Sequence, residues 1–276
     1  MLRIFCSLAI FCMVITVNGC GSIKNLLKKD NPAIYGSRGY KCFINTDLEK
    51  ALINYREACK LASKKTPQLQ AGYWLNIGRI YYELGKNDSA LTYLRKSNNA
   101  FLKYGDTAQA SMSAGYLALL YVKKGLADIA YRIYEKNNYS KNNVHEAFWL
   151  TVKARIFIQY GKYEKAVSNL KKARTIYLKA NDYDGLAGNY LFIAAIPFRK
   201  QQYKESYVLL QNALDCVDKS DVKYRRWKIL FDLALVCMQR GNKQMGIDYY
   251  SQAKGCAPQG VTLPSLGALS KNKYLF

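Results

Sequence analysis

Few residues of this chain could carry acid–base chemistry. It has one histidine, His145, which stands beside Glu146 in an asparagine-rich stretch, and a close pair of acids, Asp182 and Asp184, between two helical patterns. General acid–base catalysis requires such groups to meet in one pocket with tuned protonation. A lone histidine in a connection and two acids at a predicted turn are more typical of helix caps and turns. The sequence therefore predicts no catalytic residue and a protein that is not an enzyme.

The cysteines and glycines indicate neither a metal site nor a cofactor site. Downstream of Cys20 the cysteines are Cys42, Cys59, Cys216, Cys237 and Cys256, an odd number without a CxxC pair. This pattern signals no zinc site and no disulfide framework. Cys216 and Cys256 fall at equivalent places of a repeat, so about one helix-pair spacing separates them, which exceeds the roughly 7 Å between Cα atoms that a disulfide allows. The glycines lack the spacing of a phosphate-binding loop, so we expect no metal and no cofactor.

Residues 1–19 have the composition of a secretory signal peptide. Arg3 supplies one positive charge, a short apolar run follows, and small residues precede Cys20. The run is shorter than the roughly 20 apolar residues of a transmembrane helix, which favours removal over retention as a span.

The end of this segment, residues 17–20, resembles the bacterial lipobox, in which cleavage exposes a cysteine that is then acylated. Val17 and Asn18 depart from the commonest form of that motif. The resemblance implies lipidation of Cys20, with residues 20–32 as a tether to the first helix. An ordinary signal peptide that is cut nearby is the alternative.

Small and large residues recur along the chain with a period near 40 residues. The turn residues are Gly85, Gly125, Gly161, Gln201 and Gly241, followed five places later by the small residues Ala90, Ala130, Ala166, Ser206 and Gly246, and then by the large residues Leu94, Tyr134, Leu170, Leu210 and Tyr250. A second small set precedes the turns, at Gly78, Ala118, Ala154, Ala194 and Ala234. A small residue lets two helices approach to about 8–10 Å, and a large residue one turn away fills the space beside it. The pattern predicts five helix pairs, preceded by a degenerate pair at about residues 33–64.

The unit that begins at Trp74 resembles a tetratricopeptide repeat (TPR), because it places Trp74, Ile77, Gly78 and Tyr81 at the spacing of that motif before the glycine turn. The resemblance implies an all-α fold, a right-handed TPR superhelix (α-solenoid) of antiparallel helix pairs over residues 33–257, with a tail at residues 258–276. Because the usual repeat has 34 residues, the second helix of each unit, or the link after it, is expected to be longer. Pro197 is expected to kink a first helix or shift its start.

In this family the first helices of successive units line a groove that holds an extended or helical peptide. Transferring the lining positions to this chain predicts a peptide groove that includes Arg79, Tyr82, Lys123, Phe148, Arg155, Gln159, Arg199, Lys228, Phe231 and Met238. The cations predict ligands with acidic residues flanking hydrophobic anchors, although cations that are merely solvated would give the same pattern. Leu75 and Arg79 stand where the carboxylate clamp of chaperone-type members has lysine and asparagine, so that clamp is not expected.

The chain of 276 residues carries a formal net charge of +23. Such a surface favours acidic proteins, anionic lipid head groups or nucleic acid. The secretion signal, and the packing positions of most tyrosines that the repeat places, argue against nucleic acid. We expect a non-catalytic protein- or peptide-binding adaptor of the bacterial cell envelope, lipid-anchored to the outer membrane and facing the periplasm. The alternatives are a sensory or regulatory TPR module and an envelope factor that assists cell-wall or outer-membrane enzymes.

Overall fold

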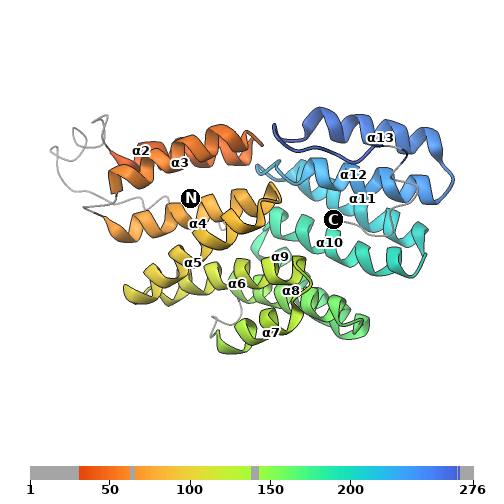
Figure 1. Cartoon of the computed structure of the whole chain (residues 1–276). Helices are drawn as coiled ribbons and strands as arrows, with labels where there is room; N and C mark the ends of the chain where they lie inside the picture. Colours follow the sequence, from red (N-terminus) through yellow and green to blue (C-terminus); the bar gives the residue numbers. More distant parts are fainter. Residues whose placement is uncertain (1–30, 63–65, 138–142, 266, 268–276) are drawn as a thin grey trace. The chain divides into compact units, whose positions relative to one another are not determined.

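The structure is a computed structural model that describes residues 31–62, 66–137, 143–265 and 267. The predicted signal peptide, Cys20 and nearly all of the predicted tether lie outside these residues, as do residues 268–276 of the predicted tail. Within the described residues every regular element is a helix, so the all-α prediction is confirmed (Figure 1).

The described helices fall into two compact units, and the first of them contains three helix pairs. These helices are α2 (Pro32–Ile44), α3 (Leu48–Ala62), α4 (Pro67–Glu83), α5 (Asn87–Lys103), α6 (Thr107–Lys123) and α7 (Ala127–Lys136). The degenerate pair predicted before the first full repeat corresponds to α2 and α3. Asn31 caps α2, because its Oδ1 accepts a hydrogen bond from the backbone N–H of Ala33 at 2.9 Å. Pro32 and Pro67 each stand at the start of a helix, where the missing N–H costs no hydrogen bond.

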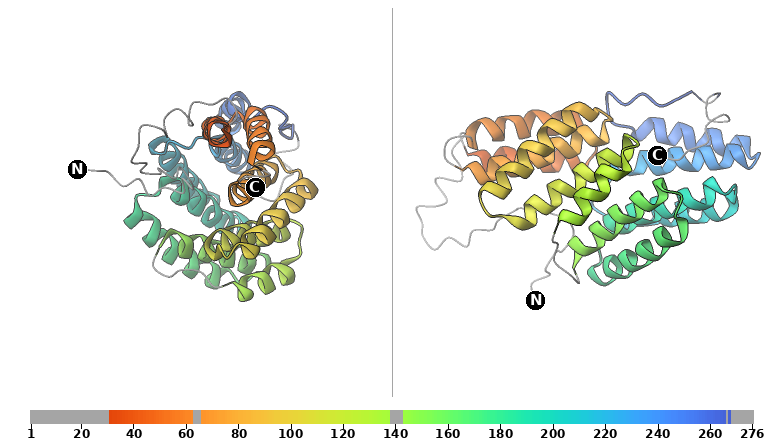
Figure 2. Two further views of the ribbon diagram at one scale, coloured as in Figure 1. Left: turned by 90° about the vertical axis from the view of Figure 1, so that its left-hand side faces the viewer. Right: turned by 60° about the horizontal axis from the view of Figure 1, so that its bottom comes forward.

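The second unit also contains three helix pairs. Its helices are α8 (Val144–Gln159), α9 (Tyr163–Ala180), α10 (Tyr183–Arg199), α11 (Tyr203–Lys219), α12 (Arg226–Gln239) and α13 (Lys243–Cys256). In each unit the two helices of a pair run antiparallel and pack along their length (Figures 1 and 2).

The predicted turns are confirmed by the backbone. Gly85, Gly125, Gly161 and Gly241 all have positive φ angles of 71° to 82°, and Gln201 takes the same left-handed conformation at φ 61°. Helices α4 and α5 each have 17 residues, and short connections separate α4, α5 and α6. From α4 to α6 the period of about 40 residues therefore comes from long helices, whereas residues 220–225 form a longer link between α11 and α12.

The paired small residues bring the two helices of a unit together as the pattern predicts. A Cβ added to Gly78 of α4 would lie 2.7 Å from Cγ of Leu94 in α5. In the second unit the hydroxyl of Ser206 donates a hydrogen bond at 3.0 Å to the carbonyl oxygen of Ala194, which its small side chain can reach. Side chains larger than these would force the helices of a pair apart.

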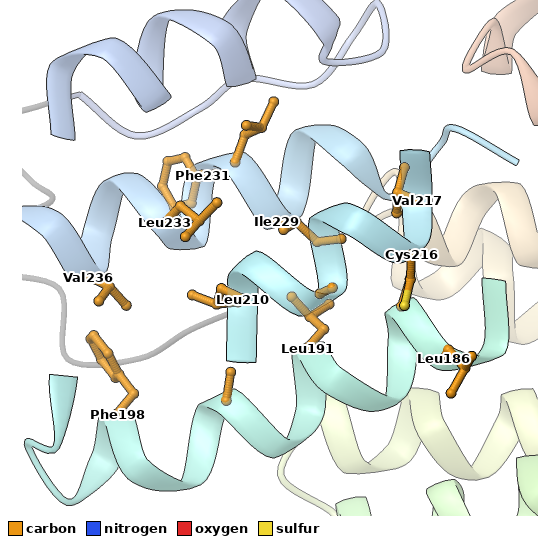
Figure 3. Close-up of a cluster of buried hydrophobic side chains, with 14 of the residues drawn as sticks. Leu186, Leu191, Phe198, Leu210, Cys216, Val217, Ile229, Phe231, Leu233 and Val236 are labelled. Atoms are coloured by element: carbon orange, nitrogen blue, oxygen red, sulfur yellow. The ribbon is translucent and has the colours of Figure 1, made fainter. Parts of the chain in front are cut away.

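One hydrophobic cluster of the second unit lies mainly between its last two helix pairs and extends to Ala147 of α8 and Tyr177 of α9. Leu191 and Phe198 of α10 pack with Leu210 of α11 and with Phe231 and Val236 of α12, and Figure 3 shows Phe198 directed toward Val236. Neither pair could bury this surface alone, so stacking the pairs removes apolar area from water and supplies the main stabilisation.

Two further features qualify the expectations from sequence. Pro197 lies in the last turn of α10, and the helix still begins at Tyr183, so the proline does not shift its start. Beyond α13, Leu263 packs against the core of the second unit, and the hydroxyl of Tyr250 donates a hydrogen bond to the carbonyl oxygen of Pro264 at 2.9 Å. The first part of the predicted tail is thus packed on the repeat.

Candidate protein-binding surface

The first helices of the second unit, α8, α10 and α12, carry seven of the predicted groove residues. Their exposure falls into three classes. Gln159 and Arg199 are exposed, whereas Arg155, Lys228 and Met238 are half-buried. Phe148 is 8% exposed and Phe231 is 0% exposed. We use the term inner face for the five accessible residues, namely Arg155, Gln159, Arg199, Lys228 and Met238.

The buried pair, Phe148 and Phe231, serves the interior instead. The ring of Phe148 contacts Trp149 in an edge-on arrangement with centroids 6.3 Å apart, and Phe231 packs in the core beside Tyr250. Two positions that line an open groove in the family are filled here by large apolar side chains that are buried in the unit. Neither phenylalanine offers surface to a peptide in this conformation.

In the first unit, only Lys123 of the three predicted groove residues is exposed. Arg79 is 8% exposed, and its guanidinium lies 5.1 Å from the ring centroid of Phe43 and 5.2 Å from that of Tyr116. Tyr82 is 9% exposed and packs edge-on against Tyr116. Arg79 therefore acts as a packing residue of the first unit, held by two aromatic faces.

Two cations of the inner face stack on aromatic rings. Arg155 lies 4.4 Å from the ring centroid of Phe192, which follows on α10, and Lys228 lies 5.5 Å from that of Trp227. Stacking on a ring face orients a cation and leaves its charge in place for an acidic partner. Sequence reasoning did not find Phe192, because it is not one of the lining positions of the family motif.

The acids Asp182 and Asp184 occupy the start of α10, as a cap or turn role predicts. Asp182 is the N-cap residue, and its Oδ1 accepts a hydrogen bond from the backbone N–H of Gly185 at 2.9 Å. Burial, helped by the charge of Asp184, raises the pKa of Asp182 to about 6. Asp184 pairs with Arg225 at 2.8 Å. Because both carboxylates are buried, they present no acid–base pair to a substrate.

The remaining chemical candidates have structural roles. His145 lies in the first turn of α8, where Asn143 caps the helix through the backbone N–H groups of His145 and Glu146, and burial lowers the pKa of the imidazole. The five cysteines downstream of residue 31 are free, and burial raises the pKa of Cys59 to about 12, which suppresses its thiolate. No group of three metal-ligating side chains is found among the described residues.

One surface cavity was not anticipated from the sequence. It has a volume of about 540 Å³ and lies where the turn between α10 and α11 meets the turn between α12 and α13. Its walls are formed by Gln201, Gln202, Tyr203, Lys204, Glu205, Arg240 and Asn242. The cavity is open and most of its wall residues are polar. Its wall residues Gln201 and Arg240 follow the inner-face residues Arg199 and Met238 by two positions in the sequence.

Comparison with known proteins supports the repeat. Residues 71–100 match the family model of the tetratricopeptide repeat, and no curated protein matches the chain. Among solved structures, a Rap protein complexed with Competence and Sporulation Factor is similar with a TM-score of 0.62 and 12% identity, over 86% of this chain and 77% of that one. The apo form of RapI is similar with a TM-score of 0.50 and 15% identity, over 82% of this chain and 97% of that one.

At these identities the structural likeness establishes the fold alone. Combined with the matched repeat at residues 71–100 and the recurring helix pairs, it shows a helical-repeat solenoid fold like that of TPR proteins. Across the described residues, no helix is both long and apolar enough to span a membrane.

Proposed function

We propose that this chain is a non-catalytic scaffold that binds proteins or peptides through the inner face of its second unit. The observation that carries the proposal is the pair of accessible arginines on successive first helices, Arg155 on α8 and Arg199 on α10. Arginine presents a planar fork of donors that fits carboxylates. The ligand class is therefore an acidic segment with hydrophobic residues, because half-buried Phe192 supplies apolar surface beside Arg155 and half-buried Met238 adds apolar surface on α12.

The fold is compatible with such a role. A Rap protein with this fold has been solved in complex with Competence and Sporulation Factor. Repeats of this kind present extended surfaces on which a partner contacts several helices at once. The acids Asp182 and Asp184 are buried, and burial raises the pKa of the free cysteines Cys216, Cys237 and Cys256. These groups leave the second unit without an evident reaction centre among its described residues.

A peptide-binding experiment tests the proposal. Fluorescent peptide libraries that vary acidic and hydrophobic positions would be titrated against the wild-type chain and an Arg155→Glu, Arg199→Glu variant. We expect acidic–hydrophobic peptides to bind the wild type and the variant to lose at least tenfold in affinity, since each reversed charge turns an attraction into a repulsion. The matched control is Lys243→Glu, Lys254→Glu, which makes the same change of charge on α13. Equal losses in both variants, or no binding to any peptide, would overturn the proposal.

A photo-crosslinking amino acid identifies the partner in cells. Placed at Gln159, which is exposed on the inner face, it should trap a defined protein, whereas the same group at the exposed Gln252 of α13 should not. The same protein trapped from both positions would argue against an inner-face site.

We also propose that the protein works in the bacterial cell envelope, anchored through an acylated Cys20 to the outer membrane on its periplasmic side. The support is the apolar run before Cys20 and the small residues next to it. Two acyl chains would hold a solenoid at a membrane stably. Metabolic labelling with an alkyne fatty acid should mark the wild type and leave Cys20→Ala unmarked, and an unlabelled wild type would remove the anchor from the proposal.

A further inference from the structure

Helix α9 differs in charge from the other second helices of the pairs. Between Tyr163 and Ala180 it carries five cations and one acid, a net charge of +4. The other second helices, α3, α5, α7, α11 and α13, range from −1 to +2 because acids are mixed with their cations. The single acid of α9, Glu164, lies in its first turn, where the helix dipole favours a negative charge.

The cations of α9 gather on its solvent-facing side. Lys165, Lys171, Lys172 and Lys179 are all exposed, and none of them forms an ion pair with another described residue. At 3.6 residues per turn these four lysines fall within an arc of roughly 120°. The opposite side of the helix packs into the unit through Ala166, Leu170, Ala173 and Tyr177.

One large apolar side chain lies at the edge of this basic arc. Leu178 is 55% exposed and follows Lys171 by two helical turns and precedes Lys179 directly. A helix that lies on a membrane combines these features, since an apolar residue enters the boundary of the acyl chains while lysines extend their stems toward the head groups. A nucleic-acid phosphate backbone would be contacted by the lysines alone and gives no role to the leucine.

From this arrangement we infer that the exposed side of α9 docks on a bilayer surface rich in anionic phospholipid. The contact orients the second unit on the membrane. Because it involves α9 and not α8, α10 or α12, the membrane inference does not depend on whether the inner face binds peptides. The charge complementarity is local, because the four lysines lie within about four turns of one helix without an intervening acid. Screening limits the attraction to short range at physiological salt.

Vesicle co-sedimentation tests the inference with the full chain carrying Cys20→Ala, so that no acyl group brings it to the lipid. Vesicles contain either phosphatidylcholine alone or phosphatidylcholine with phosphatidylglycerol. The apolar run before residue 20 would contribute to binding on both kinds of vesicle. The readout is therefore the partition coefficient on anionic vesicles divided by that on phosphatidylcholine vesicles. We expect a strong preference for the anionic vesicles at low salt that disappears at about 1 M salt, where the screening length is about 3 Å.

Three variants locate the contact. Lys171→Glu, Lys172→Glu should lower the partition onto anionic vesicles at least tenfold, given roughly fivefold per lysine at such a surface. Lys243→Glu, Lys254→Glu makes an equal change of charge on α13 of the same unit. This control variant should change the partition onto anionic vesicles less than threefold. Leu178→Ser should weaken vesicle binding by about threefold to tenfold without any change of charge. Circular dichroism melts check that each variant is folded.

The outcomes separate membrane docking from its rivals. Equal losses in the two lysine variants would assign the effect to the net charge of the whole chain and overturn the inference. Absence of any anionic preference in the wild type would do the same. A parallel titration with a fluorescent oligonucleotide covers the other anionic partner, because loss of oligonucleotide binding in the α9 variant, with vesicle binding unaltered, would make the surface a nucleic-acid contact instead.

Discussion

Arg225 and Asp184 form an ion pair that joins two successive helix pairs of the second unit. Nε of Arg225, the N-cap residue of α12, donates to Oδ1 of Asp184 in the first turn of α10 at 2.8 Å. The side chains are only 18% and 8% exposed. Gly188 lies one turn further along α10 and leaves room for the guanidinium of Arg225. A Cβ added at Gly188 would lie 3.4 Å from Cζ of Arg225. The position of Arg225 is therefore fixed by space as well as by charge.

Breaking this pair should destabilise the second unit strongly. Arg225→Met leaves the carboxylate of Asp184 buried without its cation, and we expect the free energy of unfolding to fall by about 3 kcal/mol. Urea unfolding followed by circular dichroism measures the change. Arg226→Met is the matched control, because the side chains of Arg226 and its partner Asp218 are 35% and 51% exposed. That pair should contribute at most about 1 kcal/mol, so comparable losses in the two variants would show that burial does not set the strength of the pair.

Asp182 should make the second unit less stable as the pH rises from about 4 to 6. Its pKa is about 6 in the folded chain, raised mainly by burial, whereas the ordinary value is 3.8. Between these values the folded state binds more protons than the unfolded state, so the free energy of unfolding decreases with rising pH and is level above about 6. The nearby charges are Asp184, which opposes ionisation, and Arg225, which favours it.

Asp182→Asn tests that assignment. The amide oxygen can keep the cap on the N–H of Gly185 while the buried charge is removed, so the variant should be more stable than the wild type at pH 7.5 by up to about 3 kcal/mol and similar to it at pH 4. Urea unfolding across this pH range provides the measurement. A gain of the same size at both pH values would mean that the carboxylate is not the cause.

The helix pairs could be predicted from the sequence because each of their contacts repeats. Gly78 and Leu94, or Ala194 and Ser206, stand at fixed places relative to a turn, and a pattern that recurs five times is visible without coordinates. The ion pair of Arg225 could not be found in this way. Arg225 lies in the connection before α12, where the periodic pattern is interrupted, so nothing in the sequence specifies its partner.

Exposure at the predicted groove positions was predicted only in part. The lining positions of the family place Arg79, Tyr82, Phe148 and Phe231 on one side of their helices, but the sequence does not say how closely successive helices approach. Here the side chains at those places are buried, and each packs against a further aromatic residue, namely Tyr116, Trp149 or Tyr250. The smaller set that remains accessible depends on the packing of the whole unit, which a pattern of residue types along one helix cannot specify.

Two glycines in α4 should respond to alanine in opposite ways. In Gly78→Ala the new Cβ would lie 2.7 Å from Cγ of Leu94, so the helices must separate and we expect a loss of about 1–3 kcal/mol. In Gly72→Ala nothing lies within 4 Å of the new Cβ, and the higher helix propensity of alanine should raise stability by about 0.5–1 kcal/mol. Thermal and urea unfolding compare the two. A stabilising Gly78→Ala would contradict the close approach of α4 and α5.

Gln201 occupies a turn position at which the other full repeats have glycine. Its φ of 61° lies in the left-handed region, which costs a residue with a side chain about 1–2 kcal/mol. Gln201→Gly should therefore stabilise the second unit by about 0.5–1 kcal/mol, because relief of the strain outweighs the greater freedom of glycine in the unfolded chain. The reciprocal change at the equivalent turn, Gly161→Gln, meets no atom within 4 Å of the new Cβ and should cost about 1 kcal/mol through φ alone. Urea midpoints of the two variants should move in opposite directions, and movement in the same direction would mean that backbone strain at these turns does not govern stability.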